Sequence, residues 1–284
     1  MNKSICCYLL ALAIPVFLFG CGGGSSSSSS TGIVSIGITD AKPLLPSGTT
    51  QVLITFDEAS VHRAGGGGWI SLPLAQSPYT LDLYQFTDGT TTDLVPPVEL
   101  VTGKYTQIRI GVTEAKIVIN SNEEQVKIPS EHLKTDKQFD FVVVGGGAVD
   151  LTVDFDLSQS IVVTGQGTYQ LKPVLHINHT QEAATIQASI NDKTYTTFGS
   201  SEAVVTIYWD KNDNAVVDGD DEEYTSVIVT QGAPPETQFR IFWLVPNEDY
   251  VVQVEIGGAL VHEEAVDWSN LQAGDVFVLT NSPM

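Results

Sequence analysis

The stretch LTVDFDL at residues 151–157 shows the pattern on which the fold prediction rests, because apolar residues occupy every second position. Successive side chains of an extended strand point to opposite faces of a sheet. One face of this strand is therefore apolar and is formed by Leu151, Val153, Phe155 and Leu157. The other face carries Asp154 and Asp156. We expect a half-buried strand whose two carboxylates lie on a solvated face, with a functional acid pair as the alternative.

Short runs of alternating or β-branched residues continue through the chain from Ile33, and none shows sustained apolar spacing of 3.6 residues. Many short strands are typical of antiparallel sandwiches and barrels, and not of an α/β nucleotide-binding fold. The sequence therefore predicts an all-β protein with two antiparallel β-sandwich domains, immunoglobulin-like or transthyretin-like. The clearest strands are expected at residues 33–39, 51–56, 105–112, 116–119, 139–144, 149–156, 169–177, 185–190, 204–209, 224–229, 238–243, 250–256 and 276–280.

The charge balance limits the partners of this protein. Its 284 residues carry 34 acidic and 13 basic side chains, so the formal net charge is −21. Such a charge repels phosphate backbones, and we expect no nucleic-acid partner, whereas cations, neutral ligands and basic proteins remain. The three cysteines, Cys6, Cys7 and Cys21, all lie within the first 21 residues. No internal disulfide or thiolate metal site is expected beyond that point.

Residues 1–20 are typical of a secretory signal peptide, with one basic residue ahead of a long apolar run. The run is shorter than the ~20 residues of a transmembrane helix, so we expect it to be removed. Leu18–Cys21 resembles the lipobox of bacterial lipoproteins, which implies that Cys21 is lipidated and becomes the first residue. Gly22 stands where inner-membrane retention signals place Asp, so the resemblance implies the outer membrane. A plain signal peptide with an incidental cysteine is the alternative.

Residues 21–31 are expected to form a lipidated cysteine and a Gly/Ser tether, because they lack side chains that build a core. A flexible coil of about eleven residues spans roughly 18 Å, enough to hold a domain clear of lipid headgroups. One β domain is expected at residues 32–178 and a second at 179–284, since residues 178–184 interrupt the strand pattern. Their net charges of −7 and −15 place most of the acidity in the second domain.

Several phrases of the first domain occur together in an order that resembles a known family. They are VSIGITDA at 34–41, ASVHRAG at 59–65 followed by Trp69, YTQIRI at 105–110, LTVDFD at 151–156, SIVV at 160–163 and YQLKP at 169–173. Over residues 32–177 the chain resembles domain of unknown function 4382, found in prokaryotic envelope lipoproteins. The resemblance implies a cell-envelope location, periplasmic or surface-exposed, and a β fold. It assigns no catalytic residue.

The segment DKNDNAVVDGDD at residues 210–221 has the spacing of a calcium loop. Ca²⁺ takes six to eight oxygen ligands, and alternate residues of a tightly wound loop can point at one centre. The expected ligands are Asp210, Asn212, Asn214, the carbonyl of Val216, Asp218, Asp221 and the adjacent Glu222. Ala215 stands where an EF-hand has its turn glycine, and it disfavours a left-handed conformation. The strand-like flanks exclude the helix pair of an EF-hand.

Residues 208–222 resemble the calcium loops of B-type immunoglobulin-like repeats in bacterial surface adhesins, although Asp213 and Ala215 replace two glycines. The resemblance implies a structural Ca²⁺ that stabilises a sandwich and does not catalyse. Seven carboxylates lie within residues 210–223, and a divalent ion would relieve their mutual repulsion. A solvated acidic hairpin that binds no ion is the alternative.

The usual signatures of catalysis are missing, because the chain has no Gly-x-Ser-x-Gly and no His-Glu-x-x-His segment. Its closest histidines, His176 and His179, have no acidic partner at metal spacing. We therefore expect an outer-membrane lipoprotein that is not an enzyme and that binds a glycan or a protein, as in adhesion. A polysaccharide-active enzyme using Asp154 and Asp156, or an accessory subunit of one, is the alternative.

Four further side chains are candidate ligand contacts, although structural roles are expected for them. They are His62, Trp69, Trp243 and Trp268. Sandwiches bury most of their tryptophans, because these large side chains supply core area. The sequence predicts neither the identity of the ligand nor the oligomeric state.

Overall fold

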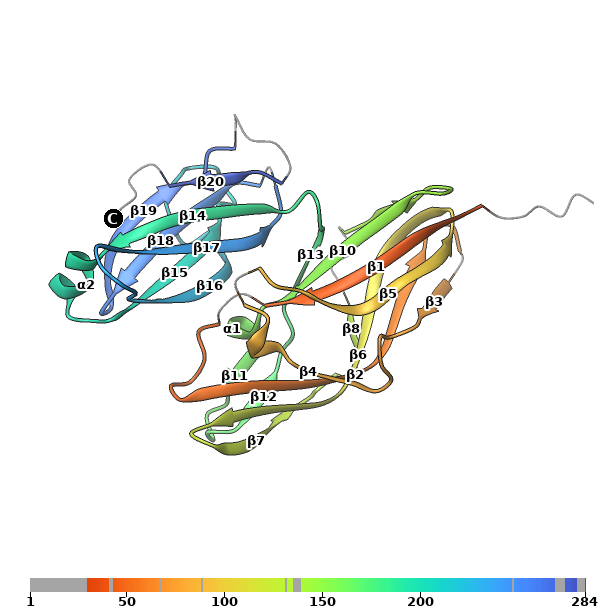
Figure 1. The fold of residues 1–284 in the computed structure, drawn as a ribbon, viewed down its shortest axis with the longest axis horizontal. Helices are drawn as coiled ribbons and strands as arrows, with labels where there is room; N and C mark the ends of the chain where they lie inside the picture. The colour runs from red at the N-terminus through yellow and green to blue at the C-terminus, as the bar shows by residue number, and fades with distance from the viewer. Residues whose placement is uncertain are drawn as a thin grey trace, which may run out of the picture.

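A computed structural model describes the protein at residues 30–40, 43–66, 68–87, 89–130, 132–134, 139–246, 248–268, 274–279 and 284. The predicted signal peptide, Cys21 and nearly all of the tether lie outside these residues. The described chain forms two β units, the first ending at His179 and the second beginning at Ala184 (Figure 1). No helix in the described part has both the length and the apolar character that crossing a membrane requires.

The first unit packs a smaller sheet against a larger one. The smaller sheet has the strand order β13 (Leu175–His179), β10 (Ala148–Phe155), β1 (Thr31–Thr39) and β5 (Thr92–Val101). The larger sheet has the order β11 (Ile161–Val163), β12 (Tyr169–Leu171), β7 (Asn122–Lys127), β6 (Gly103–Ile119), β2 (Thr49–Arg63) and β3 (Gly68–Leu72). Four short elements complete the unit: β4 (Tyr79–Asp82) on β2, β8 (His132–Lys134) and β9 (Phe141–Val143) on β6, and the 3-10 helix η1 (Leu83–Gln85).

The core of the first unit lies between its two sheets and follows the alternation of the strands. In β10 and just after it, four alternate side chains are at most 1% exposed: Leu151, Val153, Phe155 and Leu157. They pack with the equally buried Val34, Ile36 and Ile38 of the neighbouring strand β1. The predicted apolar face of residues 151–157 is therefore confirmed.

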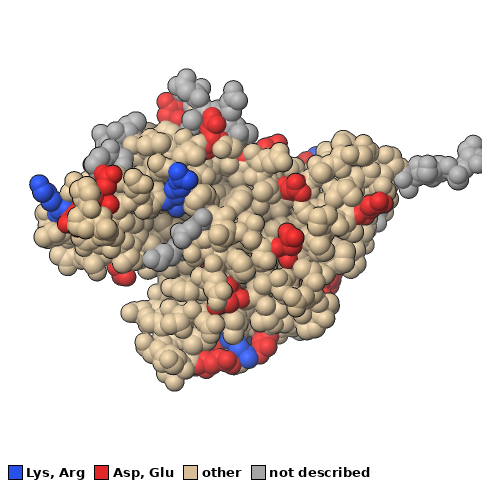
Figure 2. All heavy atoms as spheres, in the orientation of Figure 1, with Lys and Arg blue, Asp and Glu red and all other residues tan. Residues whose placement is uncertain are grey.

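The opposite face of β10 corrects the expectation of a solvated acid pair. Asp154 and Asp156 are each only 2% exposed. The reason is tertiary, because the second unit packs over this end of the smaller sheet. Figure 2 shows that other acidic side chains are spread over the visible surface of both units, where water solvates them.

The second unit is also built of two sheets. One has the order β17 (Glu236–Leu244), β14 (Ala184–Asn191) and β20 (Val276–Val278), and the other β16 (Glu222–Thr230), β15 (Glu202–Trp209), β18 (Tyr250–Ile256) and β19 (Ala259–Ala265). Its core, which includes the fully buried Ile186, Ile207 and Val252, is separate from that of the first unit. An all-β, sandwich-like architecture is therefore confirmed.

Several elements differ from the strand prediction. The periodicity did not indicate β3, β4, β5, β7, β8, β11 or β19, nor the helix α2 (Asp192–Phe198). The single strand predicted at residues 169–177 is two strands, β12 and β13, which belong to different sheets. Tyr195 is the buried residue of α2, so this helix has no apolar stripe to recognise. The Asn191 side chain caps its first turn by accepting a hydrogen bond from Lys193 N, and Gly199 ends it with a φ of 70°. Three pairs are parallel: β1–β10, β7–β12 and β14–β20.

The two units meet through α1 (Leu157–Ser160) and β13 of the first unit and β16 of the second. Ser158 Oγ donates a hydrogen bond to Ser226 O at 3.0 Å, and Gln159 Nε2 donates one to Tyr224 O at 2.7 Å. Pro43 forms an isolated bridge with Val227 of the same strand. Because β16 is an edge strand of its sheet, these contacts cover backbone groups that would otherwise stay unpaired.

Candidate functional site

The loop that joins β15 to β16 is wound around the carboxylate of Asp210. This residue directly follows β15 and is 6% exposed. Its Oδ1 accepts a hydrogen bond from Asn214 N at 3.2 Å, and its Oδ2 accepts one from Ala215 N at 2.8 Å. Asp213 and Ala215 have φ values of 53° and 66°. Both positions thus adopt the left-handed conformation that glycine favours, so the loop is wound at a backbone cost.

A second carboxylate, that of Asp218, forms hydrogen bonds with both asparagines that are predicted ligands. Its Oδ2 accepts hydrogen bonds from Asn212 Nδ2 at 3.1 Å and from Asn214 Nδ2 at 2.7 Å. Its Oδ1 accepts a bond from Asp220 N at 2.8 Å. These bonds, led by the one from Asp220 N, hold the pKa of the Asp218 carboxyl below its usual range. The negative form of Asp218 is therefore favoured in this loop.

Asp221 closes the loop by bridging its two ends. Asp221 Oδ1 accepts a hydrogen bond from Lys211 N at 3.0 Å, and Oδ2 accepts one from Asp218 N at 2.8 Å. Val216 N also donates a hydrogen bond to Asn214 Oδ1 at 2.9 Å. Six of the seven predicted ligand residues therefore share one hydrogen-bonded loop: Asp210, Asn212, Asn214, Val216, Asp218 and Asp221.

Glu222 is the predicted ligand that lies outside these hydrogen bonds. The side chain of Glu222 forms an ion pair with Lys211 Nζ at 3.3 Å and is 73% exposed, while Val216, whose carbonyl is the predicted ligand, is 48% exposed as a residue. Across the described residues, no group of three or more His, Cys, Asp or Glu side chains is placed to hold a metal ion. The loop instead combines carboxylates with amides, and in this arrangement the amide nitrogens face Asp218.

The predicted acid pair of β10 is engaged in structural contacts. Asp156 Oδ1 accepts a hydrogen bond from Gln159 N at 2.9 Å, which caps the N-terminus of α1, and Oδ2 accepts one from Gln159 Nε2 at 3.1 Å. Burial raises the pKa of Asp156, and these bonds offset part of the rise. Asp154 lies opposite His176 in the β10–β13 ladder, under the second unit.

The two neighbouring histidines also belong to packing contacts. The ring of His176 stacks on Tyr224 with 4.0 Å between centroids, and its Nε2 lies 3.0 Å from Tyr224 O. Burial lowers the pKa of His176 to about 4, so the ring is neutral near pH 7 and donates its proton to that carbonyl. His179 contacts Phe139, with 6.2 Å between ring centroids. The pair contributes to the packing around the unit junction.

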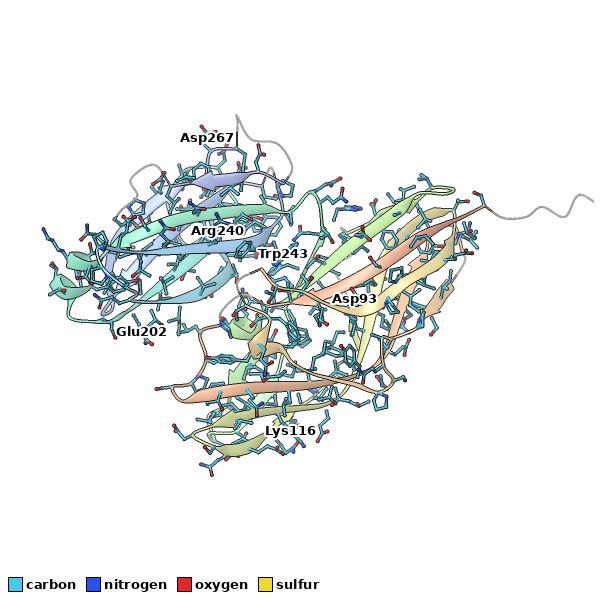
Figure 3. The ribbon with its side chains drawn as sticks, viewed as in Figure 1. Asp93, Lys116, Glu202, Arg240, Trp243 and Asp267 are labelled. Carbon is cyan, nitrogen blue, oxygen red and sulfur yellow. The ribbon has the colours of Figure 1, made fainter. Side chains whose placement is uncertain are left out.

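A pocket of about 170 Å³ lies where the two units meet. Its lining residues come from four segments of the chain: Asp40 and Gly89 from the first unit, Val227–Thr230 of β16, and Thr237–Arg240, Phe242 and Trp243 of β17. Figure 3 shows Arg240 and Trp243 on β17, with Trp243 at the side that meets the first unit. Sequence reasoning missed this pocket, because no local pattern reveals which distant segments become neighbours.

The remaining candidate contacts lie elsewhere. The guanidinium carbon of Arg109 lies 3.8 Å from the centroid of the Trp69 ring. The His62 ring makes an edge contact with the same tryptophan. Trp268 packs on the core of the second unit and donates a hydrogen bond from Nε1 to Glu248 O at 2.6 Å. Of the three predicted tryptophan contacts, Trp243 is the one that lines the pocket.

Fold and contacts together define a class: an all-β protein of two packed sandwich units, with a pocket at their junction and an acidic hairpin on the second unit. Residues 31–173 match the family described as Domain of unknown function (DUF4382). Because the match covers half of the chain, the protein belongs to this family. A search of curated proteins found no relative with significant similarity.

Three solved structures are distantly similar, and each is described as a "putative cell adhesion protein". The one from Bacteroides fragilis has 12% identity and a TM-score of 0.22, and the match covers 86% of this chain and 91% of that one. The one from Bacteroides ovatus has 9% identity and a TM-score of 0.21, over 87% and 95% of the two chains. The one from Bacteroides eggerthii has 10% identity and a TM-score of 0.19, over 88% and 82%. TM-scores this low establish no shared fold, so no property is carried over from these proteins.

Proposed function

We propose that this protein is a non-catalytic binding module for a glycan or a protein, in the manner of an adhesin. The observation that carries the proposal is the junction pocket, which both units line and which offers aromatic, amide and guanidinium groups. Ligand sites occur preferentially at such boundaries between domains and combine apolar walls with a few polar groups. A binding role needs no reactive pair of side chains at the pocket.

The alternative of a polysaccharide-active enzyme is less well supported. A glycosidase places two carboxyl groups on either side of a sugar, about 5–10 Å apart. Asp154 and Asp156, which would fill these roles in this alternative, are each 2% exposed, and Asp156 caps α1. We expect immobilised polysaccharides to retain the protein without release of reducing sugar. Release of reducing sugar that is lost in Asp154→Asn would overturn the binding proposal in favour of the enzyme.

Attachment to the outer membrane is part of the same proposal. Lipidation at Cys21 would tether the folded units through the Gly/Ser segment that follows it. Two or three acyl chains hold a protein stably on a membrane, whereas one chain binds only marginally. The module would then act in the cell envelope, facing either the periplasm or the medium.

We further propose that the loop at residues 210–222 binds a structural Ca²⁺. The support is the arrangement of Asp210, Asp218 and Asp221 with Asn212 and Asn214 in one tightly wound loop. Rotation of each amide by half a turn would direct its oxygen, in place of its nitrogen, at a cation, and a backbone carbonyl would add a further ligand. For Asn214 this rotation would break the hydrogen bond that its Oδ1 accepts from Val216 N. Glu222 would have to exchange its Lys211 partner for the ion.

Calcium should raise the melting temperature of the second unit. Extracellular calcium modules bind with dissociation constants of about 10⁻⁴–10⁻³ M, so ~10 mM calcium at a Kd of ~1 mM adds about 1.4 kcal/mol to the free energy of unfolding. Thermal melts with and without calcium measure this shift. Asp210→Ala combined with Asp218→Ala should abolish it, because this variant lacks the two carboxylates that accept most of the hydrogen bonds of the loop.

The matched control removes the same two charges elsewhere in the second unit. Glu202→Ala combined with Glu255→Ala changes exposed residues of β15 and β18, away from the loop. We expect this variant to keep the full calcium shift. An unchanged melt of the native protein at millimolar calcium, or an equal loss of the shift in both double variants, would remove the ion from the proposal.

A further inference from the structure

Two neighbouring aromatic residues of β17, Phe242 and Trp243, occupy a bulge. The β14–β17 ladder shifts register between Ile241 and Leu244, so these two residues lie opposite a single residue of β14. Trp243 has a φ of 67°, which a bulky residue rarely adopts. Bulges re-aim side chains and are common at sheet edges and beside functional sites. β17 is an edge strand, and its bulge forms part of the junction pocket.

Contacts from the first unit meet the two aromatic residues of the bulge. Phe242 and Trp243 both line the pocket. Contacts from the first unit hold this arrangement: Asn178, 5% exposed, donates a hydrogen bond from Nδ2 to Trp243 O, and a Cβ at Gly89 would lie 2.9 Å from the Phe242 ring. A strained conformation persists only where its surroundings determine it, and such sites often bind ligands.

Arg240, on the same strand, supplies the cationic group of the pocket. Its Nε donates a hydrogen bond to Gln187 Oε1 at 2.7 Å, which orients the guanidinium. Within the described residues, its terminal nitrogens form no hydrogen bond and no ion pair. This is notable in a chain with 34 acidic and 13 basic side chains, where three lysines do have carboxylate partners. A free, planar guanidinium fork matches a carboxylate geometrically.

The other groups of the pocket suit a sugar better than a simple anion. Gln238 of β17 offers an amide group and the two aromatic residues offer apolar area, whereas Thr237 Oγ1 already accepts a hydrogen bond from Gly232 N at 2.7 Å. Asp40 also lines the pocket, but it is 2% exposed and accepts a hydrogen bond from Leu157 N at 3.1 Å. It therefore forms part of the pocket wall and is not a ligand contact. A volume of about 170 Å³ is below that of typical drug-sized sites, which favours a single ring.

We propose that the junction pocket binds one uronic-acid unit of an acidic polysaccharide. The ligand carboxylate pairs with Arg240, the sugar ring packs against Phe242 and Trp243, and a ring hydroxyl bonds to the Gln238 side chain. The inference rests on the proposed binding function and names its ligand class.

Calorimetric titration of the full-length protein with tetragalacturonate tests the proposal. Tetragalacturonate should bind, and its methyl ester should bind at least tenfold more weakly because it lacks the charge for Arg240. Arg240→Gln should weaken binding of the acid at least tenfold, and Phe242→Ala should weaken the acid and the ester alike. Lys193→Gln removes an exposed positive charge outside the pocket and should leave the affinity unchanged. Melting curves establish that each variant is folded.

Four outcomes would overturn the uronic-acid site: no binding by the native protein at millimolar ligand, equal binding of acid and ester, undiminished binding by Arg240→Gln, or equally tight binding of poly-glutamate. If one of these outcomes occurs but the native protein still retains other glycans, the uronic-acid site is wrong and the proposed binding function stands. In that case the protein remains a binding module whose ligand lies elsewhere.

Discussion

His176 shows how tertiary contacts set the chemistry of one side chain. In the sequence it is one of five dispersed histidines, with nothing to separate it from the others. In the fold its ring stacks on Tyr224 of the other unit, and burial lowers its pKa from 6.5 to about 4. His176 is therefore neutral in the folded protein at pH 7, whereas in the unfolded chain its pKa has the usual value of 6.5.

This shift predicts a loss of stability in acid. Between pH 6.5 and about 4 the unfolded chain binds the proton and the folded chain does not, so the free energy of unfolding falls as the pH drops. The contribution of neutral His176 to the free energy of unfolding is complete above pH 6.5. Its loss on acidification amounts to at most about 3 kcal/mol. Denaturant unfolding at several pH values measures the slope. His176→Gln should flatten it.

His62→Gln is the control for this experiment, because His62 lies on β2 of the first unit and contacts Trp69 and not the junction. The control should keep the slope of the native protein. An identical slope in His176→Gln would show that other groups cause the acid sensitivity. Asp156 acts in the opposite sense, since burial raises its pKa and the folded state then binds its proton more readily.

At the scale of an element, helix α1 depends on a residue that the sequence placed in another role. Asp156 was expected on a solvated strand face, and it instead accepts the backbone hydrogen bond of Gln159 at the start of the helix. Acceptors at this position satisfy amide groups that have no partner within the helix. The helix then directs Ser158 and Gln159 at β16 of the second unit.

Removing the cap should therefore destabilise the protein. Asp156→Ala should lower the free energy of unfolding by about 1 kcal/mol, the usual effect of losing an N-cap side chain. Asp156→Asn keeps an oxygen acceptor and should retain most of that stability. Urea unfolding at pH 7 measures both variants. If asparagine and alanine were equally costly, the negative charge and not the cap would explain the role of Asp156.

At the scale of the whole molecule, polar contacts join the two units. Gln159, His176 and Asn178 of the first unit all bond to backbone carbonyls of the second. Buried carbonyls that lose such partners are costly, because water does not replace the donor. We therefore expect the two units to stabilise one another, although each has a core of its own.

Calorimetry should detect this coupling as a single unfolding transition. Ser158→Ala combined with Gln159→Ala should lower the melting temperature and separate the transitions of the two units, because β16 loses its side-chain donors from α1. Ser71→Ala combined with Gln125→Ala, at exposed positions of the larger sheet of the first unit, is the matched control and should leave one transition. Two separate transitions in the native protein would contradict mutual stabilisation.

The sequence by itself determined the strands with clear alternation, the division into β-rich segments and the family. It also placed Asp210 and its neighbours in one loop, because ligands a few residues apart need only local winding. Glu222 stays a predicted ligand, and in the structure its side chain forms an ion pair with Lys211. Helix α2 was missed because it buries little and so leaves no periodic trace.

Only the tertiary structure decided what covers each strand. In LTVDFDL the alternation depends on neighbouring residues alone, so the apolar face was predictable. Burial of Asp154 and Asp156 depends on a second unit whose contacting strands lie about 70 residues further along. The junction pocket arises in the same way, because residues 40, 89 and 227–243 become neighbours only after both units have folded and packed together.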